Sequence, residues 1–249
     1  MQMEKASLIE RLNFYIGKVD DAWISSLIGA SKEDIDLLKK YSGLKEHNLE
    51  LPNSFIEFID KAGEGDGGLI SNVLNGKMSV KRLVDINKGI YEMWPETMHP
   101  FEFEFLYDEV GIPYIIKLGN NNEIEYENTC YISSSFEKLL FQCAVRKYEE
   151  MFYQKKIRFG ASIKSFKESK NRRKGDTIMS IMDELIKEYN LECAWFNDNY
   201  FFCARNDIFS IILLKRVAMA GQLSGNDISQ MDDFLRRLLP MIGAEIQSF

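Results

Sequence analysis

Hydrophobic residues recur at helical spacing at the start of the chain, and this pattern predicts two amphipathic helices there. The first lies within residues 5–23, where apolar and aromatic side chains fall on one helical face: Leu8, Ile9, Leu12, Tyr15, Ile16 and Val19. The second begins after Ser31, because a serine with an acidic residue three positions later, here Asp34, is typical of a capped helix start. Gly43 then ends this second helix.

Residues 51–68 form the most distinctive run of the chain, and they predict a short helix followed by a sharp exit. Pro52 suits the first turn of a helix, where its missing N–H is not needed. Apolar side chains make the inward face of this helix: Phe55, Ile56, Phe58 and Ile59. The glycine-dense segment 63–68 then closes the helix and leads into a strand.

The middle of the chain changes to short apolar pieces, and we assign residues 69–132 to a strand region. Alternation and turn signals predict these strands: Phe101–Phe105, Pro113–Lys117, Ile124–Tyr126 and Cys130–Ile132. The asparagine-rich segment 119–122 is a turn, and a helix capped by Ser134 closes the unit. We therefore predict an α+β fold, in which N-terminal helices pack on a mostly antiparallel sheet with a closing helix.

A second, smaller unit follows a basic segment. Residues 155–174 hold nine Lys or Arg and one acid, so we interpret residues 151–175 as a basic, solvated linker. A helix is predicted from residue 176, and a final helix opens near Asn226 and ends around Pro240. The strands predicted between them are Leu191–Phe196, Tyr200–Ala204 and Ile208–Val217. The expected organisation is a domain over residues 1–150, the linker, and an αβββα unit over residues 176–249.

Charge is unevenly distributed along the chain, and this bears on the partner. Residues 1–150 hold 26 acidic and 16 basic side chains, whereas residues 151–249 hold 12 and 15. The first unit therefore repels nucleic acid and favours a basic partner. No run approaches the length of a membrane span, and no secretory signal opens the chain, so we expect a cytoplasmic protein without a membrane contact.

The sequence offers little catalytic chemistry. Its cysteines are widely spaced without a nearby histidine, so we predict no metal site and no cofactor. His47 and His99 lie in no recognisable catalytic context, and we expect no enzyme. Period-two acids such as Glu123 and Glu125 leave a hydrolase with paired carboxylates as the weakest alternative. Residues 63–68 lack the lysine of a phosphate-binding loop, which favours a structural junction.

Three segments resemble a known family. The run Leu51–Gly68, the strand and turn Gly111–Gly119 and the segment Ile132–Leu140 occur in the order seen in the SUKH superfamily. That superfamily is the group around the yeast Smi/Knr cell-wall regulators and the bacterial Syd protein. The resemblance covers about residues 20–145 and leaves residues 176–249 outside it. Many bacterial members are immunity proteins that neutralise toxins by direct contact, so the resemblance implies a binding role without catalytic residues.

Resemblance and charge together give the functional hypothesis. We expect a non-catalytic immunity protein whose partner is a basic toxin domain, such as a nuclease. An intracellular scaffold or regulator of the Smi/Knr type is the alternative, with residues 176–249 mediating a homodimer or a second contact. The candidate contact residues are acidic: Glu102, Glu104, Asp108, Glu109, Glu64 and Asp66. Complementary charge of this kind speeds association and helps to select the partner.

Overall fold

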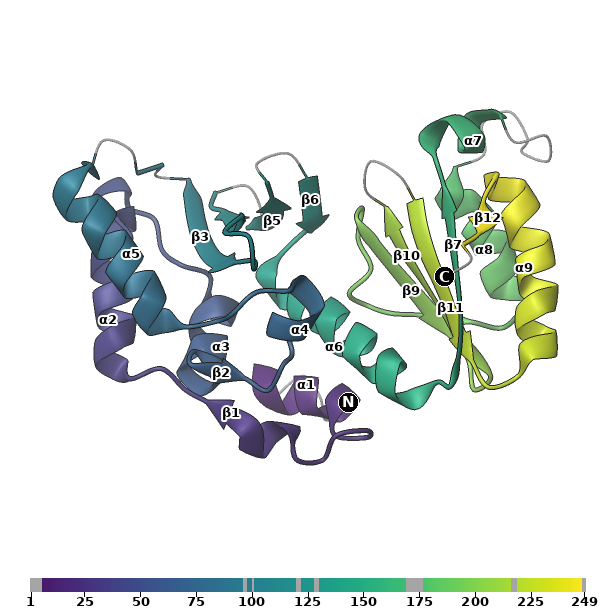
Figure 1. The fold of residues 1–249 in the computed structure, drawn as a ribbon, viewed down its shortest axis with the longest axis horizontal. Coiled ribbons are helices and arrows are strands. Elements are labelled where there is room, and N and C mark those ends of the chain that lie inside the picture. Colours follow the sequence, from purple (N-terminus) through teal and green to yellow (C-terminus); the bar gives the residue numbers. More distant parts are fainter. Residues whose placement is uncertain are drawn as a thin grey trace. The chain divides into compact units, whose positions relative to one another are not determined.

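The computed structural model describes residues 6–95, 98–99, 101–119, 122–127, 130–168, 177–215 and 219–247. The chain divides into two compact units, Met1–Tyr148 and Glu149–Phe249. Helices and antiparallel sheets build both units, which confirms the α+β class (Figure 1). Within the described ranges, no helix has the length and apolar composition needed to cross a membrane.

Helices dominate the start of the first unit. Their bounds are α1 Leu8–Ile16, α2 Lys32–Tyr41, α3 Asn53–Ala62, α4 Ser71–Leu74 and α5 Val80–Met93. The helix α6, Phe136–Phe152, ends the first unit and its last residues belong to the second. The Ser31 hydroxyl accepts the N–H of Asp34, which confirms the predicted cap of α2. α6 begins at Phe136, so its cap is Ser135, one residue later than expected, and the Ser135 hydroxyl accepts the N–H of Lys138 at 3.2 Å.

The strands of the first unit form two antiparallel sheets. The larger sheet follows chain order: β3 Glu102–Tyr107, β4 Pro113–Lys117, β5 Glu123–Tyr126 and β6 Cys130–Ser133. These are the strands that alternation predicts. A separate pair joins β1 (Leu27–Ile28) to β2 (Gly65–Asp66), so the exit from α3 pairs with a segment near the N-terminus.

A cluster of phenylalanines joins helices and sheet in the first unit. The ring of Phe55 on α3 lies 5.5 Å from Phe103 of β3 and 5.1 Å from Phe136 of α6, measured between centroids. Phe105 of β3 lies 5.4 Å from Phe136 in an edge-to-face arrangement. All of these rings are buried. Buried aromatic pairs dominate core energetics, so this cluster fixes α3 and α6 on the sheet.

The exit from α3 is organised around one buried carboxylate. Asp66 is only 3% exposed. Its two oxygens accept the N–H groups of Gly68 at 2.9 Å, Ile70 at 2.7 Å and Ser71 at 2.8 Å. The Ser71 hydroxyl donates as well, at 2.8 Å. These charge-assisted bonds offset the lost hydration of the carboxylate and begin α4 at the same time.

Distant segments converge on this exit. The indole N–H of Trp23 donates to the carbonyl of Asp66 at 3.0 Å, and the Lys147 ammonium donates to the carbonyl of Gly67 at 2.6 Å. Gly67 has a φ of +59°, and a Cβ there would lie 2.5 Å from both Trp23 and Ser26. Only glycine suits this backbone and this packing, which supports the interpretation of residues 63–68 as a structural junction.

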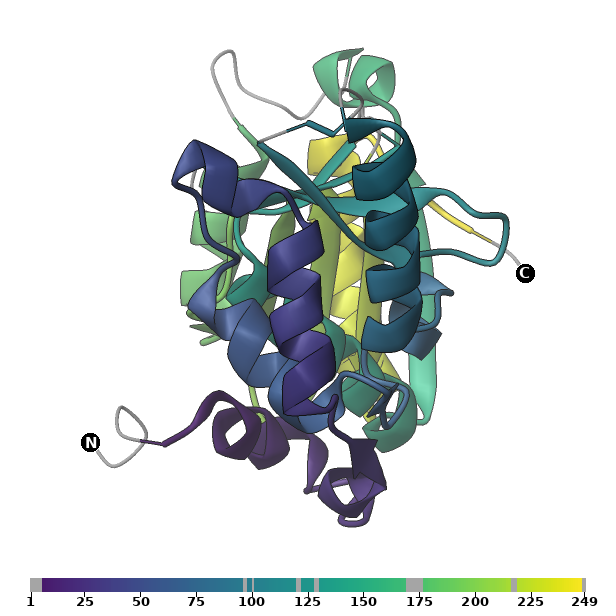
Figure 2. The same ribbon diagram turned by 90° about the vertical axis from the view of Figure 1, so that its left-hand side faces the viewer.

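The segment after Gly68 differs from the expected strand region, because it forms α4 and α5. The Ser79 hydroxyl accepts the N–H of Arg82 at 3.3 Å and begins α5. Val80, Leu83 and Val84 are buried at helical spacing. The apolar residues between 80 and 84 therefore form the buried face of α5. α5 lies beside α2 in both views (Figures 1 and 2).

The second unit is a sheet with helices on one face (Figure 1). Its strands are β7 Lys155–Ala161, β8 Glu192–Cys193, β9 Phe201–Arg205, β10 Phe209–Lys215, β11 Met219–Gly225 and β12 Glu245–Ile246, in the spatial order β12-β7-β11-β10-β9-β8. Its helices are α7 Ile163–Glu168, α8 Ile178–Glu188 and α9 Ile228–Ile242. α8 and α9 bury a core that includes Phe159, Met182 and Phe234.

The prediction of a linker over residues 151–175 is wrong up to residue 168, because α6 ends only at Phe152, β7 is an inner strand of this sheet, and α7 follows it. Ile157, Phe159 and Ala161 belong to the core or pack against it, and Lys156 and Arg158 alternate with them. The basic composition hid this alternation. Residues 169–175 of the expected linker lie outside the described residues.

Two further boundaries in the second unit differ from expectation. Strand β11 was missed, because its glycines, alanine and serine give no apolar run. Helix α9 continues past Pro240 to Ile242, and Gly243 ends it with a φ of +62°. Proline removes one N–H donor, yet the helix closes two residues later on a left-handed glycine.

Replacing Asp66 with Asn should lower the free energy of unfolding by about 3 kcal/mol, because an amide NH₂ would replace an acceptor that faces several donors. Urea unfolding followed by circular dichroism measures this change. Asp60→Asn is the matched control, because Asp60 is exposed and forms a surface ion pair with Lys61 at 2.9 Å. Equal stability of the Asp66 variant and the control would contradict the role assigned to Asp66.

Candidate partner-binding surface

Glu102 and Glu104 lie on the same face of β3, where the alternating pattern placed them. Lys117 on β4 pairs in register with Glu102 and also with Glu123 on β5. Glu104 and Glu125 occupy the next row of that face. We call these five residues the acidic sheet face. It sets four carboxylates against one ammonium group, so the face carries a negative field.

Lys117 is the electrostatic centre of the acidic sheet face. Its ammonium lies 2.5 Å from a carboxylate oxygen of Glu102 and 2.7 Å from one of Glu125. Burial acts to lower the pKa of Lys117, but the hydrogen bonds and charges of both glutamates outweigh it and raise that pKa. Glu125 is only 4% exposed, so it serves mainly to hold Lys117. The side chain of Glu102 stays partly exposed beside the Lys117–Glu125 ion pair.

Asp108 organises the turn between β3 and β4. One carboxylate oxygen accepts the N–H groups of Val110 at 3.0 Å and Ile112 at 2.8 Å. The other accepts the Tyr126 hydroxyl at 2.7 Å. The Tyr126 hydrogen bond is the largest cause that lowers the pKa of Asp108, and the backbone amides add to it against the effect of burial. The N–H of Gly111 also donates to the Asp108 carbonyl, which closes a β-turn.

The turn presents two residues to solvent. Glu109 is exposed, and Val110 is 79% exposed. The N–H of Glu109 donates to the carbonyl of Asn75 at 3.0 Å, which anchors the turn from a second side. We call Asp108–Gly111 the acidic hairpin tip. It combines a rigid backbone with an exposed acid and an exposed apolar side chain, which is suited to contact with another protein.

Glu64 and Asp66 have structural roles instead. The Glu64 carboxylate accepts the Ser79 hydroxyl and the N–H of Lys81, both at 2.9 Å, and so supports the start of α5. Asp66 is buried and fully engaged with the exit from α3. The prediction of Asp66 as a contact residue is therefore corrected, because a partner has no access to its carboxylate.

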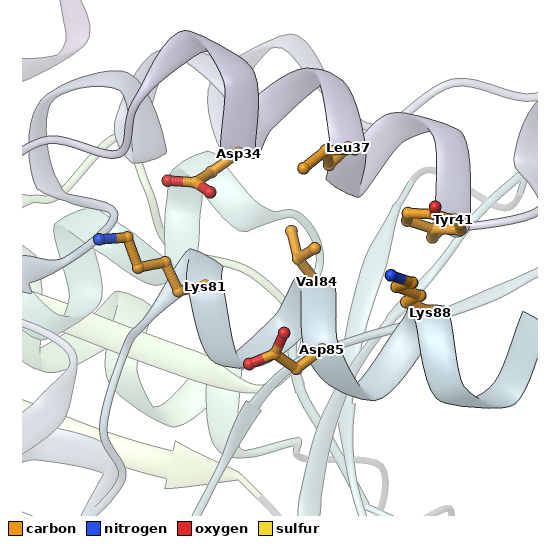
Figure 3. Close-up of a pocket in the computed structure, with 7 residues that line it drawn as sticks. All are labelled: Asp34, Leu37, Tyr41, Lys81, Val84, Asp85 and Lys88. Atoms are coloured by element: carbon orange, nitrogen blue, oxygen red, sulfur yellow. The ribbon is translucent and has the colours of Figure 1, made fainter.

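A groove between α2 and α5 has a volume of about 340 Å³. Its lining combines two aspartates, two lysines and three other side chains: Asp34, Asp85, Lys81, Lys88, Leu37, Tyr41 and Val84. Figure 3 shows Leu37 and Val84 between the charged ends of the groove. The Asp34 carboxylate already accepts the Ser31 hydroxyl at 2.6 Å. Its two aspartates balance the charge of its two lysines, so the groove carries no net field toward an acidic or a basic ligand.

The remaining chemistry of the described residues is sparse. No group of three or more His, Cys, Asp or Glu within these ranges could hold a metal ion. His47 and His99 are both exposed and line neither the groove nor the acidic sheet face.

Sequence reasoning missed Val110, Lys117 and Tyr126. A signal for the first was present, because Asp at the first position and Gly at the fourth are typical of a type I turn, which projects the residues between them. Lys117 and Tyr126 could not be found this way. Their partners lie on other strands, and register is not visible in one sequence.

Comparison with protein-family models, curated proteins and solved structures finds no match to this chain. The SUKH resemblance therefore remains a prediction based on residues 51–68, 111–119 and 132–140.

Replacing Tyr126 with Phe should loosen the acidic hairpin tip, because Asp108 loses one of its hydrogen bonds. We expect the amides of Val110 and Ile112 to exchange about tenfold faster in NMR hydrogen exchange. Tyr91→Phe is the matched control, since the Tyr91 hydroxyl donates to Glu46 at 2.8 Å, another tyrosine–carboxylate bond. Unchanged exchange in the Tyr126 variant would show that the tip does not depend on this bond.

Proposed function

We propose that this chain is a non-catalytic protein-binding module that acts as an immunity protein against a toxin. The observation that carries the proposal is the acidic hairpin tip, whose backbone is fixed by Asp108 while Glu109 and Val110 remain exposed. A turn that is already ordered loses little conformational entropy on binding. An exposed apolar residue beside an acid matches the usual interface pattern of an apolar contact with a polar rim.

Charge supports a basic partner. The first 150 residues have ten more acidic than basic side chains, and the acidic sheet face continues from the hairpin tip along β3. Such a field raises the rate of encounter with a basic surface and disfavours acidic ones. Nuclease toxins need a basic surface to grip nucleic acid, so a toxin of this class fits the charge of the first unit.

The resemblance of residues 20–145 to the SUKH superfamily supports the same function, because many bacterial members bind and neutralise toxins. The second unit supports the alternative of an intracellular scaffold, since it has a core of its own within Glu149–Phe249. A scaffold would use that unit for a second contact or for a homodimer. The two functions differ in the partner, and a toxin gene beside the gene for this chain favours immunity.

Reversing the charge of Glu109 should slow association with the toxin domain encoded beside this gene. We expect Glu109→Lys to lower the association rate about tenfold at low salt and much less in 1 M salt, where the Debye length is about 3 Å. Stopped-flow fluorescence measures both rates. Asp36→Lys makes the same charge change on exposed α2 and should have the smaller effect. Equal effects of the two variants would exclude the tip as the contact.

The immunity function itself is tested by growth. Co-expression of the chain with the adjacent toxin should restore growth, and Val110→Asp should weaken this rescue because it buries a charge in the contact. We expect affinity to fall at least tenfold, measured by calorimetry. Failure of the unaltered chain to restore growth would contradict the immunity function. Full rescue and full affinity in Val110→Asp would contradict the assigned surface.

A further inference from the structure

A buried acid, Glu149, stands at the start of the second unit on the last turns of α6. Its side chain is 2% exposed. The Ser210 hydroxyl on β10 donates to its Oε1 atom. Its Oε2 atom is enclosed and has no hydrogen-bond partner among the described residues. This environment is unfavourable for a carboxylate, because the charge on its second oxygen has no hydrogen-bond donor.

The strands next to Glu149 carry a row of polar residues. The register pairs Lys156 of β7 with Ser224 of β11, and Ser224 with Ser210 of β10. Ser210 pairs in turn with Arg205 of β9. Directly paired residues share one face of a sheet, so two serines lie between two cations. We call Lys156, Ser224, Ser210 and Arg205 the polar row.

Opposed effects act on the protonation of Glu149. Burial raises its pKa to about 7 from 4.5, although the hydroxyls and the cations of the polar row lower it. Two hydroxyls and two peripheral charges therefore fail to replace the water that the carboxylate loses on burial. Near pH 7 the group is close to its own midpoint, so both forms are populated there.

The other titratable and charged groups around Glu149 come from β9 and α6. The Cys203 thiol lies on the same sheet face as Arg205, and burial together with the charge of Glu149 raises its pKa. On α6, Arg146 lies three residues before Glu149, and Tyr153 lies four residues after it, with its N–H donating to the Glu149 carbonyl.

We propose that Glu149 is a proton-operated latch that fastens the end of α6 to the sheet of the second unit. The neutral carboxyl group stays buried against Ser210. On ionisation, the Oε2 charge has no donor in place, and the last turn of α6 loosens so that water or a cation of the polar row reaches it. The latch acts on the helix along which the chain passes from the first unit to the second.

The direction of the pH effect follows from proton binding. Between pH 4.5 and 7 the folded state binds a proton that the unfolded chain releases. The stability that this proton confers is present in full below pH 4.5, falls as pH rises, and is lost above about 7. From pH 5 to pH 8 the opening constant of the second unit should rise about 70-fold through this group alone.

The test uses the full-length protein with ¹³C-labelled glutamate. NMR should show one carboxyl resonance with a midpoint near pH 7, and Glu149→Gln should remove it. Ser210→Ala should move that midpoint upward, because it deletes a donor that favours the ionised form. It also assigns the resonance if the glutamine variant does not fold. A Glu149 midpoint near 4.5 would overturn the proposal.

Amide exchange of β10 and β11 supplies the second measurement. The opening constants of the unaltered protein and Glu149→Gln should diverge by about 70-fold between pH 5 and pH 8. The control Glu192→Gln, at an exposed glutamate of β8, should keep the pH dependence of the unaltered protein. A merely structural Glu149 would change stability equally at all pH values, and that result would also overturn the latch.

Discussion

The buried carboxylate of Asp66 is the interaction on which the first unit depends. It fixes the turn that leaves α3 and accepts N–H groups at the start of α4. It also fixes the backbone carbonyls of Asp66 and Gly67, which accept hydrogen bonds from Trp23 and Lys147. Segments near residues 20, 66 and 147 therefore meet at one place, although they are far apart in the chain. A charge can be buried here only because several donors surround it. The same requirement explains the glycines, since a side chain at Gly67 would displace Trp23.

Carboxylates serve two different purposes in this protein. Asp66, Glu64 and Asp108 accept hydrogen bonds from backbone N–H groups and hydroxyls, and these bonds fix the local backbone. Glu109 lies in the turn that Asp108 holds, and it remains free to meet a partner. The binding function that we propose thus uses two groups of acidic residues in the first unit, one structural and one exposed. Rigid acids set the geometry of the turn, and an exposed acid supplies long-range attraction.

Sequence patterns predicted the elements with strong periodicity and failed where composition masked it. The alternation around Phe103 and the cap at Ser31 were sufficient to find β3 and α2. Strand β7 was not predicted because the basic residues Lys156 and Arg158 alternate with its core residues, and β11 because glycines replace large apolar residues. The surface that we propose for partner contact was predicted only in part. Glu109 is accessible, but the burial of Asp66 and the hold of Tyr126 on Asp108 arise from tertiary contacts that no local pattern encodes.

We propose that the acidic hairpin tip is the surface that meets a basic partner. Hydrogen-exchange mass spectrometry of the full-length chain, with and without the toxin domain encoded beside its gene, tests this most directly. The account predicts protection concentrated in residues 102–112, with the strongest effect at the turn. Protection confined to residues 149–249, or to the groove between α2 and α5, would contradict it.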